Sequence, residues 1–549
     1  MAYFFPLIGY IANGLAYSTT RWSFIMFFYL SFMVASMFNE VVNEFTKRDS
    51  AICIVLFVVW LIIEVLLQEK NDIFSIRIVV YSLIWISTII LLLLYNSQRV
   101  SHIRIIHRII LFTVISNTIL NAFLFFAPSS IGGSGIGGSF KALNSVNPEI
   151  MESKLAENSD KYNFNDSFHR FDFNDTAIDA PLMLGINSTY SYYSICNGSV
   201  FDIYNDTRIS PAIMDTFCLQ GVDGRQVLES ILSVRKFAMN SNDCNIVDND
   251  YYLPIGFTYD SYISENEVMK YDYLQRMNIL MSDIVLDTTD LHDMSVNSFC
   301  SDNKERIIPI DIKYGDGIEK TGNQLKVSKG ASISLSFDPS SENEPGEEYY
   351  VYLKNLTSVF SDNDLYKADI SIDDKYVRIR SKENEWFYNN DYDYLVQVQN
   401  AKSKGKIDIV FQESGVYSLD SVEIIDNYIG NFAEKYNKLN EDVLEDVRLE
   451  DNKLMGDINL SSGKWLFVSF PYSKGWSCTI DGKEAKIVKA NYSFMSVFVP
   501  QGKHEIVFSY VTPGIKLGMF ISLIAVLFFI IWNVLCSHHN SKNSIGRSD

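Results

Sequence analysis

The chain has 549 residues, of which 48% are hydrophobic, and it carries a formal net charge of −20. An apolar fraction and an acidic fraction of this size must occupy different parts of the chain, which excludes a single uniform soluble domain. Nucleic-acid binding relies on basic side chains that neutralise phosphates, so no nucleic-acid partner is expected for so acidic a chain.

Apolar runs of the length of a transmembrane helix lie at both ends of the chain. They span residues 22–39, 51–67, 78–95, 109–127 and 515–536. A helix needs about 20 residues to cross a hydrocarbon core of ~30 Å. Residues 22–127 are therefore predicted to form four transmembrane helices and residues 513–536 a closing one, and the acidic stretch between them is predicted to be an aqueous domain.

Basic residues in the short loops predict the orientation, because cytoplasmic loops of membrane proteins carry the excess of Lys and Arg. The turns at 44–50 and 96–108 and the tail at 537–549 contain such residues and are placed in the cytoplasm. The large domain then lies outside the cell. Residues 1–21 also lie outside, either as an external loop or with residues 3–17 entering the membrane as a re-entrant segment, and the sequence leaves both open.

Residues 128–163 begin with PSSIGGSGIGGS and are predicted to be a tether. Gly133, Gly135 and Gly138 have the spacing of a dinucleotide-binding loop, but no strand precedes them, so a flexible linker is the better interpretation. The cysteine spacings match no disulfide framework and no zinc pattern. No cofactor and no metal site are therefore expected.

The aqueous region divides by its residue pattern. Residues 164–300 mix short strand-like and helical stretches, which predicts an α+β part. Residues 301–428 alternate apolar and polar side chains, as in ASISLSF at 331–337, which predicts a β-sandwich. Residues 429–512 are predicted to form a connecting helix and a terminal β module. The fold class is thus an α-helical membrane block, an extracytoplasmic β-rich domain and a C-terminal transmembrane helix.

The terminal module contains a clear hairpin signal at Asp481 and Gly482, which stand between two alternating runs. Both positions of such a turn need a positive φ, which Gly adopts freely. Asp481 is accordingly predicted to be a turn residue and not a catalyst. Trp476 is predicted to be a core residue in preference to a platform on which a sugar stacks. The aromatic residue of YVTPG, Tyr510, is expected at the level of the lipid headgroups.

The segment from WLFVSFP to the last helix contains a set of motif residues: Gly475, Trp476, Asp481, Gly482, Phe494, Met495, Gly502, His504, Pro513, Gly514 and Gly518. In these residues the segment resembles the terminal module of the bacterial YfhO family of membrane proteins. NGLAYSTTRWSF at 13–24 is similar to an external loop of the family, and FHRFDF at 168–173 fits the ectodomain in the right order. The resemblance covers almost the whole chain and implies a multi-pass protein of the bacterial cell membrane.

The family is similar to GT-C-type glycosyltransferases, which have more helices and place a catalytic acid in an early external loop. Nothing in this chain aligns with that half, so the chain is expected to be the C-terminal part of a longer or split protein, with an upstream-encoded N-terminal half as a partner. The resemblance implies transfer of a sugar from a polyprenyl-phosphate carrier to an envelope polymer such as teichoic acid. It leaves the catalytic residue unassigned, and whether this chain is itself an enzyme stays open.

Polar residues within membrane helices are candidates for function because they are costly there. Glu64 lies in the second predicted helix, and Asn117 and Asn121 share one face of the fourth. With Asn13 and Arg21 at the outer side, they would line a groove for a lipid phosphate, which Arg reads through two parallel hydrogen bonds. Alternatively, Glu64 only reaches the headgroups and the two Asn residues only join neighbouring helices.

Three functions remain open from the sequence. The first is part of a lipid-linked sugar transferase. The second is a non-catalytic envelope module that binds a polymer or a partner chain. The third, a transporter component, is least favoured, because the four helices show no inverted repeat and few charges for a pathway.

Overall fold

The computed structural model describes residues 28–29, 32–33, 36–37, 46–67, 112, 168–173, 181, 186–192, 197–209, 214–215, 218–238, 246–287, 304–339, 346–360, 367–373, 375–380, 392–398 and 405–545. The chain divides into two compact units, Met1–Asn147 and Pro148–Asp549.

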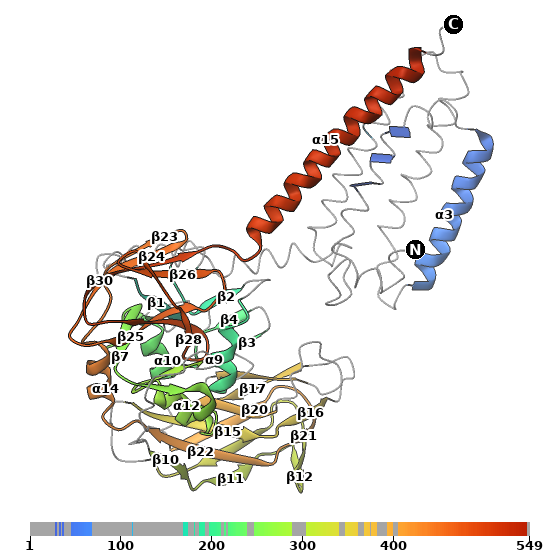
Figure 1. Cartoon of the computed structure of the whole chain (residues 1–549). Helices are drawn as coiled ribbons and strands as arrows, with labels where there is room; N and C mark the ends of the chain where they lie inside the picture. Colours follow the sequence, from blue (N-terminus) through green and yellow to red (C-terminus); the bar gives the residue numbers. More distant parts are fainter. Residues whose placement is uncertain are drawn as a thin grey trace. The chain divides into compact units, whose positions relative to one another are not determined.

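In the first unit the structure describes the helix α3 (Lys47–Leu67), shown in blue in Figure 1. Its start is fixed by a reciprocal cap: the Thr46 backbone N–H donates to Asp49 Oδ2 at 2.9 Å, and the Asp49 N–H donates to Thr46 Oγ1 at 3.3 Å. This helix covers the predicted membrane helix at 51–67. The predicted helices at 22–39, 78–95 and 109–127 lie almost entirely outside the described residues, so the four-helix block stays a prediction.

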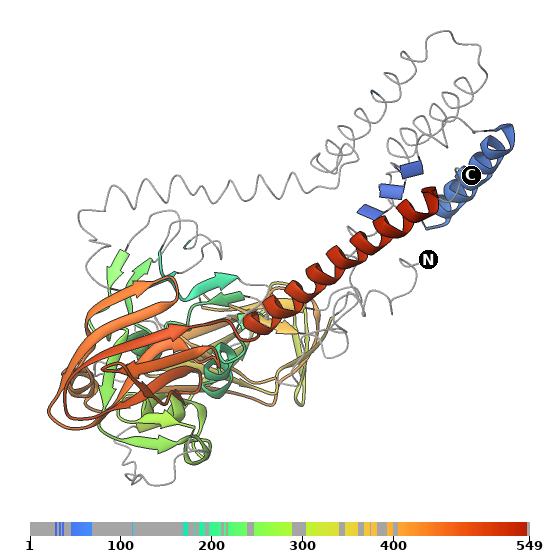
Figure 2. The ribbon, with the colours of Figure 1, turned by 45° about the horizontal axis from the view of Figure 1, so that its top comes forward.

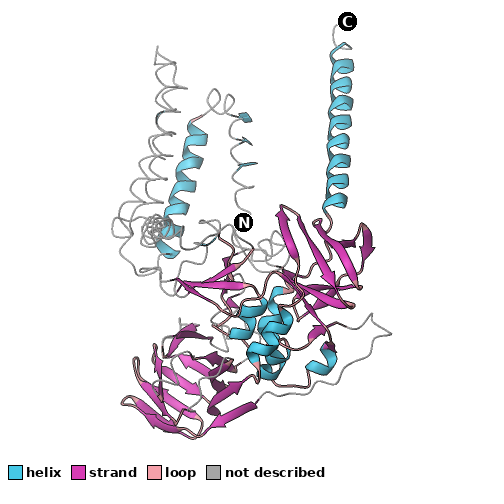
Figure 3. Ribbon diagram, turned by 90° about the vertical axis from the view of Figure 1, so that its left-hand side faces the viewer, coloured by secondary structure: helices cyan, strands magenta, loops and turns pink. Residues whose placement is uncertain are grey.

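The second unit begins with two small sheets and four short helices. One sheet has the order β1-β5-β6 (Arg170–Phe173, Val234–Ala238, Ile246–Asp248), and the other has the order β2-β4-β3 (Tyr190–Tyr192, Cys218–Gln220, Met214–Asp215). The helices are α9 (Val200–Asp206), α10 (Gln226–Ile231), α11 (Glu265–Val268) and α12 (Tyr273–Ile279). The short helices of this unit gather between two groups of strands, as Figure 3 shows.

A six-stranded sheet joins parts of the chain that are far apart in sequence. Its order is β7-β25-β29-β28-β9-β8, with bounds Gly256–Tyr259, Lys464–Pro471, Phe494–Val499, Val488–Ala490, Ile284–Leu286 and Tyr262–Ser264. Strands from the predicted α+β part thus pair with strands from the predicted terminal module.

The run WLFV in β25 is apolar at every position because the sheet is covered on both faces. Trp465 and Phe467 pack into one core with residues of α10 and α12. Leu466 and Val468 pack into a second core against the neighbouring five-stranded sheet. That sheet has the order β23-β24-β30-β26-β27, with bounds Glu445–Glu450, Lys453–Leu460, Gly502–Tyr510, Trp476–Ile480 and Lys483–Ala485. The helix α14 (Phe432–Leu439) precedes it, and Figure 2 shows these strands in orange and red.

Three antiparallel sheets between residues 304 and 428 enclose a third core. Their orders are β10-β22-β15-β19 (Lys304–Ile308, Ser421–Tyr428, Glu347–Lys354, Tyr394–Gln397), β11-β14-β20-β17-β18 (Asp311–Tyr314, Ser332–Ser336, Lys406–Phe411, Lys367–Ile372, Lys375–Arg380) and β12-β13-β21-β16 (Ile318–Thr321, Gln324–Val327, Gly415–Ser418, Thr357–Phe360). Buried and less buried residues alternate along β20, as the sequence pattern predicts. The predicted β-rich character of this part of the chain is confirmed.

After β30 the chain enters the long helix α15 (Ile515–Ile545). Its segment Ile515–Trp532 has a mean hydropathy of 2.5 and is the one helix among the described residues that is long and apolar enough to cross a membrane. The side chains of this segment are exposed to their surroundings and not buried by the protein, as expected of a surface that faces lipid. The predicted apolar helix at the C-terminus is confirmed.

Candidate functional site

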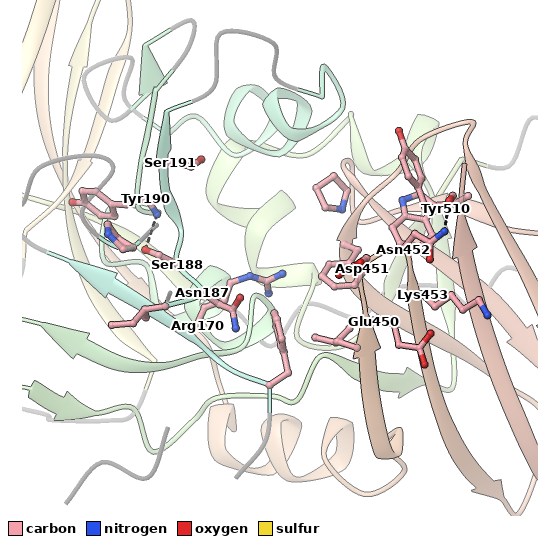
Figure 4. Close-up of a pocket in the computed structure, with 17 residues that line it drawn as sticks. Arg170, Asn187, Ser188, Tyr190, Ser191, Glu450, Asp451, Asn452, Lys453 and Tyr510 are labelled. Carbon is pink, nitrogen blue, oxygen red and sulfur yellow. Dashed lines mark hydrogen bonds between the residues drawn. The ribbon is translucent and has the colours of Figure 1, made fainter. Parts of the chain in front are cut away.

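A cavity of about 520 Å³ lies in the second unit, where the segments around β1 and β2 face the five-stranded sheet. This volume lies within the range of pockets that bind small molecules. Figure 4 shows Asn187 and Ser188 on one side of the cavity and Glu450, Asp451 and Asn452 on the other.

Four aromatic rings form one wall of the cavity. Phe470 and Trp476 are stacked, with ring centroids 5.9 Å apart and planes 15° from parallel. Trp476 and Tyr510 are partners across β26 and β30, and their centroids are 5.1 Å apart. Phe168 meets Phe470 edge to face at 5.9 Å. The strand pairing therefore places Tyr510 and Trp476 side by side, and the aromatic contacts extend the wall to Phe168.

Gly475 permits this arrangement because the chain that leaves β30 passes directly over it. A Cβ atom at Gly475 would lie 2.4 Å from the Val511 carbonyl oxygen and 2.6 Å from Tyr510 Cε2. The Val511 N–H also donates a hydrogen bond to the Gly475 carbonyl at 2.9 Å. Glycine is thus required here for close approach, and it fixes Trp476 beside the segment that leads to α15.

Arg170, from the FHRFDF motif, is a fixed cation in the cavity wall. Its Nη1 donates to the Leu232 carbonyl at 2.6 Å and to Ser469 Oγ at 2.9 Å, and its Nη2 donates to the Ser469 carbonyl at 2.8 Å. The guanidinium carbon lies 4.9 Å from the centroid of the Phe168 ring. Burial lowers the pKa of Arg170 to about 10, so the group is charged at neutral pH. Among the described residues, no carboxylate pairs with it.

The turn between β23 and β24 lies beside Tyr510, across the cavity from Asn187 and Ser188, and supplies Glu450, Asp451, Asn452 and Lys453 (Figure 4). The Tyr510 N–H donates to the Asn452 carbonyl at 2.8 Å, which ties the turn to the aromatic wall. The cavity therefore offers cationic and amide donors, carboxylate acceptors and aromatic faces together.

The residues of the predicted groove for a lipid phosphate all belong to the first unit. Asn13, Arg21, Asn117 and Asn121 lie outside the described residues. Glu64 lies in α3, and the structure describes the helix there but not the position of that side chain. The groove stays a prediction.

The hairpin at Asp481 and Gly482 is present as the sequence predicts. Ile480 pairs with Lys483, so the two residues between them form the turn, and their φ angles are 52° and 74°. Asp481 Oδ2 lies 2.7 Å from His504 Nδ1, and its Oδ1 accepts from the Glu505 N–H at 2.9 Å. Gly502 begins β30 with a φ of 128°. The cavity is lined by none of the motif residues Asp481, Gly482, Gly502 and His504.

The contact with His504 holds the pKa of Asp481 below its usual value, with the Glu505 N–H as a second cause. The same hydrogen bond raises the pKa of His504. Both shifts favour the charged forms of the two side chains, so the pair fastens the hairpin to β30.

Trp476 packs against the core of the five-stranded sheet, in line with its prediction as a core residue, but its ring is only partly buried and also lines the cavity. Arg170 and the turn at 450–453 were not singled out from the sequence as site residues. FHRFDF was visible as a family-like motif, whereas the turn carried no signal before its pairing with Tyr510 was known.

Comparison with known proteins identifies a family that matches this chain. The family model described as "Bacterial membrane protein YfhO" matches residues 1–522. The curated "Uncharacterized protein YfhO" of Bacillus subtilis (strain 168) is 25% identical over 396 residues, which are 67% of this chain and 43% of that protein. This chain therefore spans less than half the length of that relative.

Among solved structures, a match to arabinofuranosyltransferase AftD from Mycobacteria covers 28% of this chain and 13% of the AftD chain. The sequence identity is 11% and the TM-score is 0.12. A similarity this low supports no conclusion about fold or function. The match of the family model over nearly all of the sequence shows that the chain belongs to the YfhO family of bacterial membrane proteins.

Proposed function

We propose that this chain takes part in the glycosylation of a cell-envelope polymer, such as teichoic acid, from a polyprenyl-phosphate-linked sugar. It does so within a multi-pass protein of the bacterial membrane whose β-rich domain lies outside the cell. Membership of the YfhO family supports the membrane setting. The observation that carries the proposal is the cavity of aromatic and polar side chains whose wall residue Tyr510 stands five positions before the membrane helix begins at Ile515.

The cavity is suited to holding a substrate and not to the transfer step itself. General acid or base catalysis needs a carboxylate held within hydrogen-bond reach of the reacting oxygen. Glu450 and Asp451 are exposed at the rim on a turn, where water competes for them. We therefore assign binding to the described domain and place the chemistry in the membrane part of the family's architecture, with Arg21 and Glu64 among the groove residues.

The exposure of these two carboxylates also favours the second candidate function. In that function the chain is a non-catalytic envelope module that binds a polymer and presents it to a partner chain. The two candidates differ in whether the chain adds anything to sugar transfer.

Reconstitution in liposomes tests the proposal. The liposomes contain a polyprenyl-phosphate sugar and an envelope acceptor polymer, and the chain is added alone or with a separately expressed N-terminal half of a YfhO protein. We expect no transfer by the chain alone and transfer by the combination. Trp476→Ala should reduce the combined rate, whereas Tyr376→Ala, an exposed aromatic residue on β18 remote in sequence from the cavity residues, should not.

Transfer by this chain alone that is abolished by Glu64→Gln would make Glu64 the catalyst and would overturn the division between binding and chemistry. Polymer binding with no transfer under any combination would support the non-catalytic module.

A further inference from the structure

We propose that the cavity binds one uncharged pyranose ring of a glycan that is anchored in the same membrane. This inference rests on the proposed function and names the substrate class of the cavity. The ring would lie on the wall formed by Phe470 and Trp476, and its hydroxyl groups would reach Arg170 on one side and the turn at 450–453 on the other.

The aromatic wall fits one face of a pyranose. Such a ring carries C–H bonds on its faces and hydroxyl groups around its edge, and the partly positive C–H groups pack on the negative face of an aromatic ring. Phe470 and Trp476 are parallel to within 15°, and both line the cavity. A purely apolar ligand would make no use of the polar side chains of the turn at 450–453, whereas the hydroxyl groups of a sugar can bond to them.

The polar groups favour an uncharged polyol over an ion. Arg170 and Lys453 donate hydrogen bonds, and Glu450 and Asp451 accept them, so the cavity presents two cations and two anions. An anionic ligand would meet the two carboxylates, and a cationic ligand would meet Arg170, whose position is fixed by three hydrogen bonds. Hydroxyl groups both donate and accept, so a sugar satisfies both sides.

The position of the cavity along the chain argues for a glycan anchored in the membrane. Tyr510 lines the cavity, and the helix α15 begins five residues later at Ile515. A fully extended chain covers at most about 3.6 Å per residue, so the two positions are no more than about 18 Å apart. The Tyr510 N–H donates to the Asn452 carbonyl, and the Val511 N–H donates to the Gly475 carbonyl. These hydrogen bonds fix the first residues of the short connection to the cavity wall.

Hydrogen–deuterium exchange of the full chain in nanodiscs tests the inference. The discs contain phosphatidylglycerol and phosphatidylethanolamine, with or without glucosyl and galactosyl diacylglycerol. We expect the glycolipids to slow exchange several-fold at the turn 450–453 and at residues 187–191. The core amides of β24 and β29 should exchange equally in both discs and report that the fold is intact.

Three variants define the site. Ser191→Tyr fills the cavity without removing the aromatic wall, and Trp476→Ala removes part of that wall, so both should lose the protection. Tyr376→Ala, which changes an aromatic side chain that is 68% exposed on β18, should keep it. Ser191→Tyr keeps the inference testable if Trp476→Ala does not fold.

Protection that persists in Ser191→Tyr, or no protection in the wild type, would overturn the inference. Equal protection by soluble methyl glucoside and methyl galactoside would overturn the requirement for a membrane anchor. The measurement involves no sugar transfer, so protection without transfer by the reconstituted protein would refute the proposed function and leave this inference standing.

Discussion

The ammonium group of Lys375 lies 2.8 Å from Oδ1 of Asp223, whose side chain is fully buried. Lys375 belongs to β18, and Asp223 stands three residues before the start of α10 at Gln226. Asp223 Oδ2 also accepts from the Gln397 N–H at 2.8 Å and from Arg225 Nε at 3.3 Å. Arg225 in turn donates to the carbonyls of Thr207 and Leu395. One carboxylate therefore organises the contact between the sheets at 304–428 and the helices beside them.

Removing this carboxylate should destabilise the protein strongly. Asp223→Ala leaves the buried guanidinium of Arg225 and the ammonium of Lys375 without their anion, and breaking a buried ion pair in this way costs about 3–5 kcal/mol. Chemical denaturation of the purified chain would measure the loss. The matched control is Glu319→Ala, which removes the exposed pair with Lys326 at 3.2 Å and should cost less than about 1 kcal/mol. Equal losses in the two variants would contradict the organising role of Asp223.

The pair formed by Asp481 and His504 should make stability depend on pH. The pKa of His504 is raised, so its contribution is complete below the ordinary value of 6.5 and is lost as the pH rises through the higher folded value. The pKa of Asp481 is lowered, so its contribution is present above 3.8 and is lost as the pH falls through the folded value.

Between these limits both partners are charged. The difference in unfolding free energy between the wild type and His504→Ala should therefore be larger near about pH 5.5 than near about pH 8.5. Denaturation curves at the two pH values and low ionic strength would measure it. His504→Gln can keep a hydrogen bond to Asp481 but does not titrate, so its stability should vary less with pH over this range. A constant difference across pH would exclude a titrating pair.

Gly475→Ala should disturb the cavity and the start of α15 together. The added Cβ would lie 2.4 Å from the Val511 carbonyl oxygen, so the backbone must shift, and overpacking of this kind costs about 1–3 kcal/mol. Gly198→Ala is the control, because nothing lies within 4 Å of its Cβ position. We expect a lower melting temperature and weaker glycolipid protection for Gly475→Ala alone. Unchanged protection in this variant would show that Gly475 does not support the wall.

The orientation of the chain can be tested with a membrane-impermeant thiol reagent on intact cells. In a variant without its native cysteines, a cysteine introduced at Val359, which is 64% exposed, should be labelled. A cysteine at Ser101, in the basic turn at 96–108, should be spared until the cells are permeabilised, because the excess of positive charge places this turn in the cytoplasm. Labelling of Ser101 alone would reverse the predicted topology.

Local chemistry in the sequence determined the elements whose cause lies within a few residues. Asp481 and Gly482 form the predicted turn because their positive φ angles require residues of this kind. The alternation along 406–411 predicts a strand with one buried face, and the apolar run after Ile515 predicts the C-terminal helix, because burial and hydropathy are read directly from side chains.

Only the tertiary structure decided which of these elements meet. The apolar run WLFV predicts a strand. The sequence does not show that one face of this strand packs against helices α10 and α12 and the other face against a separate sheet. Arg170 donates to Ser469, 299 positions away in the sequence, and Trp476 lines a cavity together with residues around β1 and β2. A periodic pattern fixes which face of a strand is buried but not which distant segment covers it, because that choice depends on the packing of the whole domain.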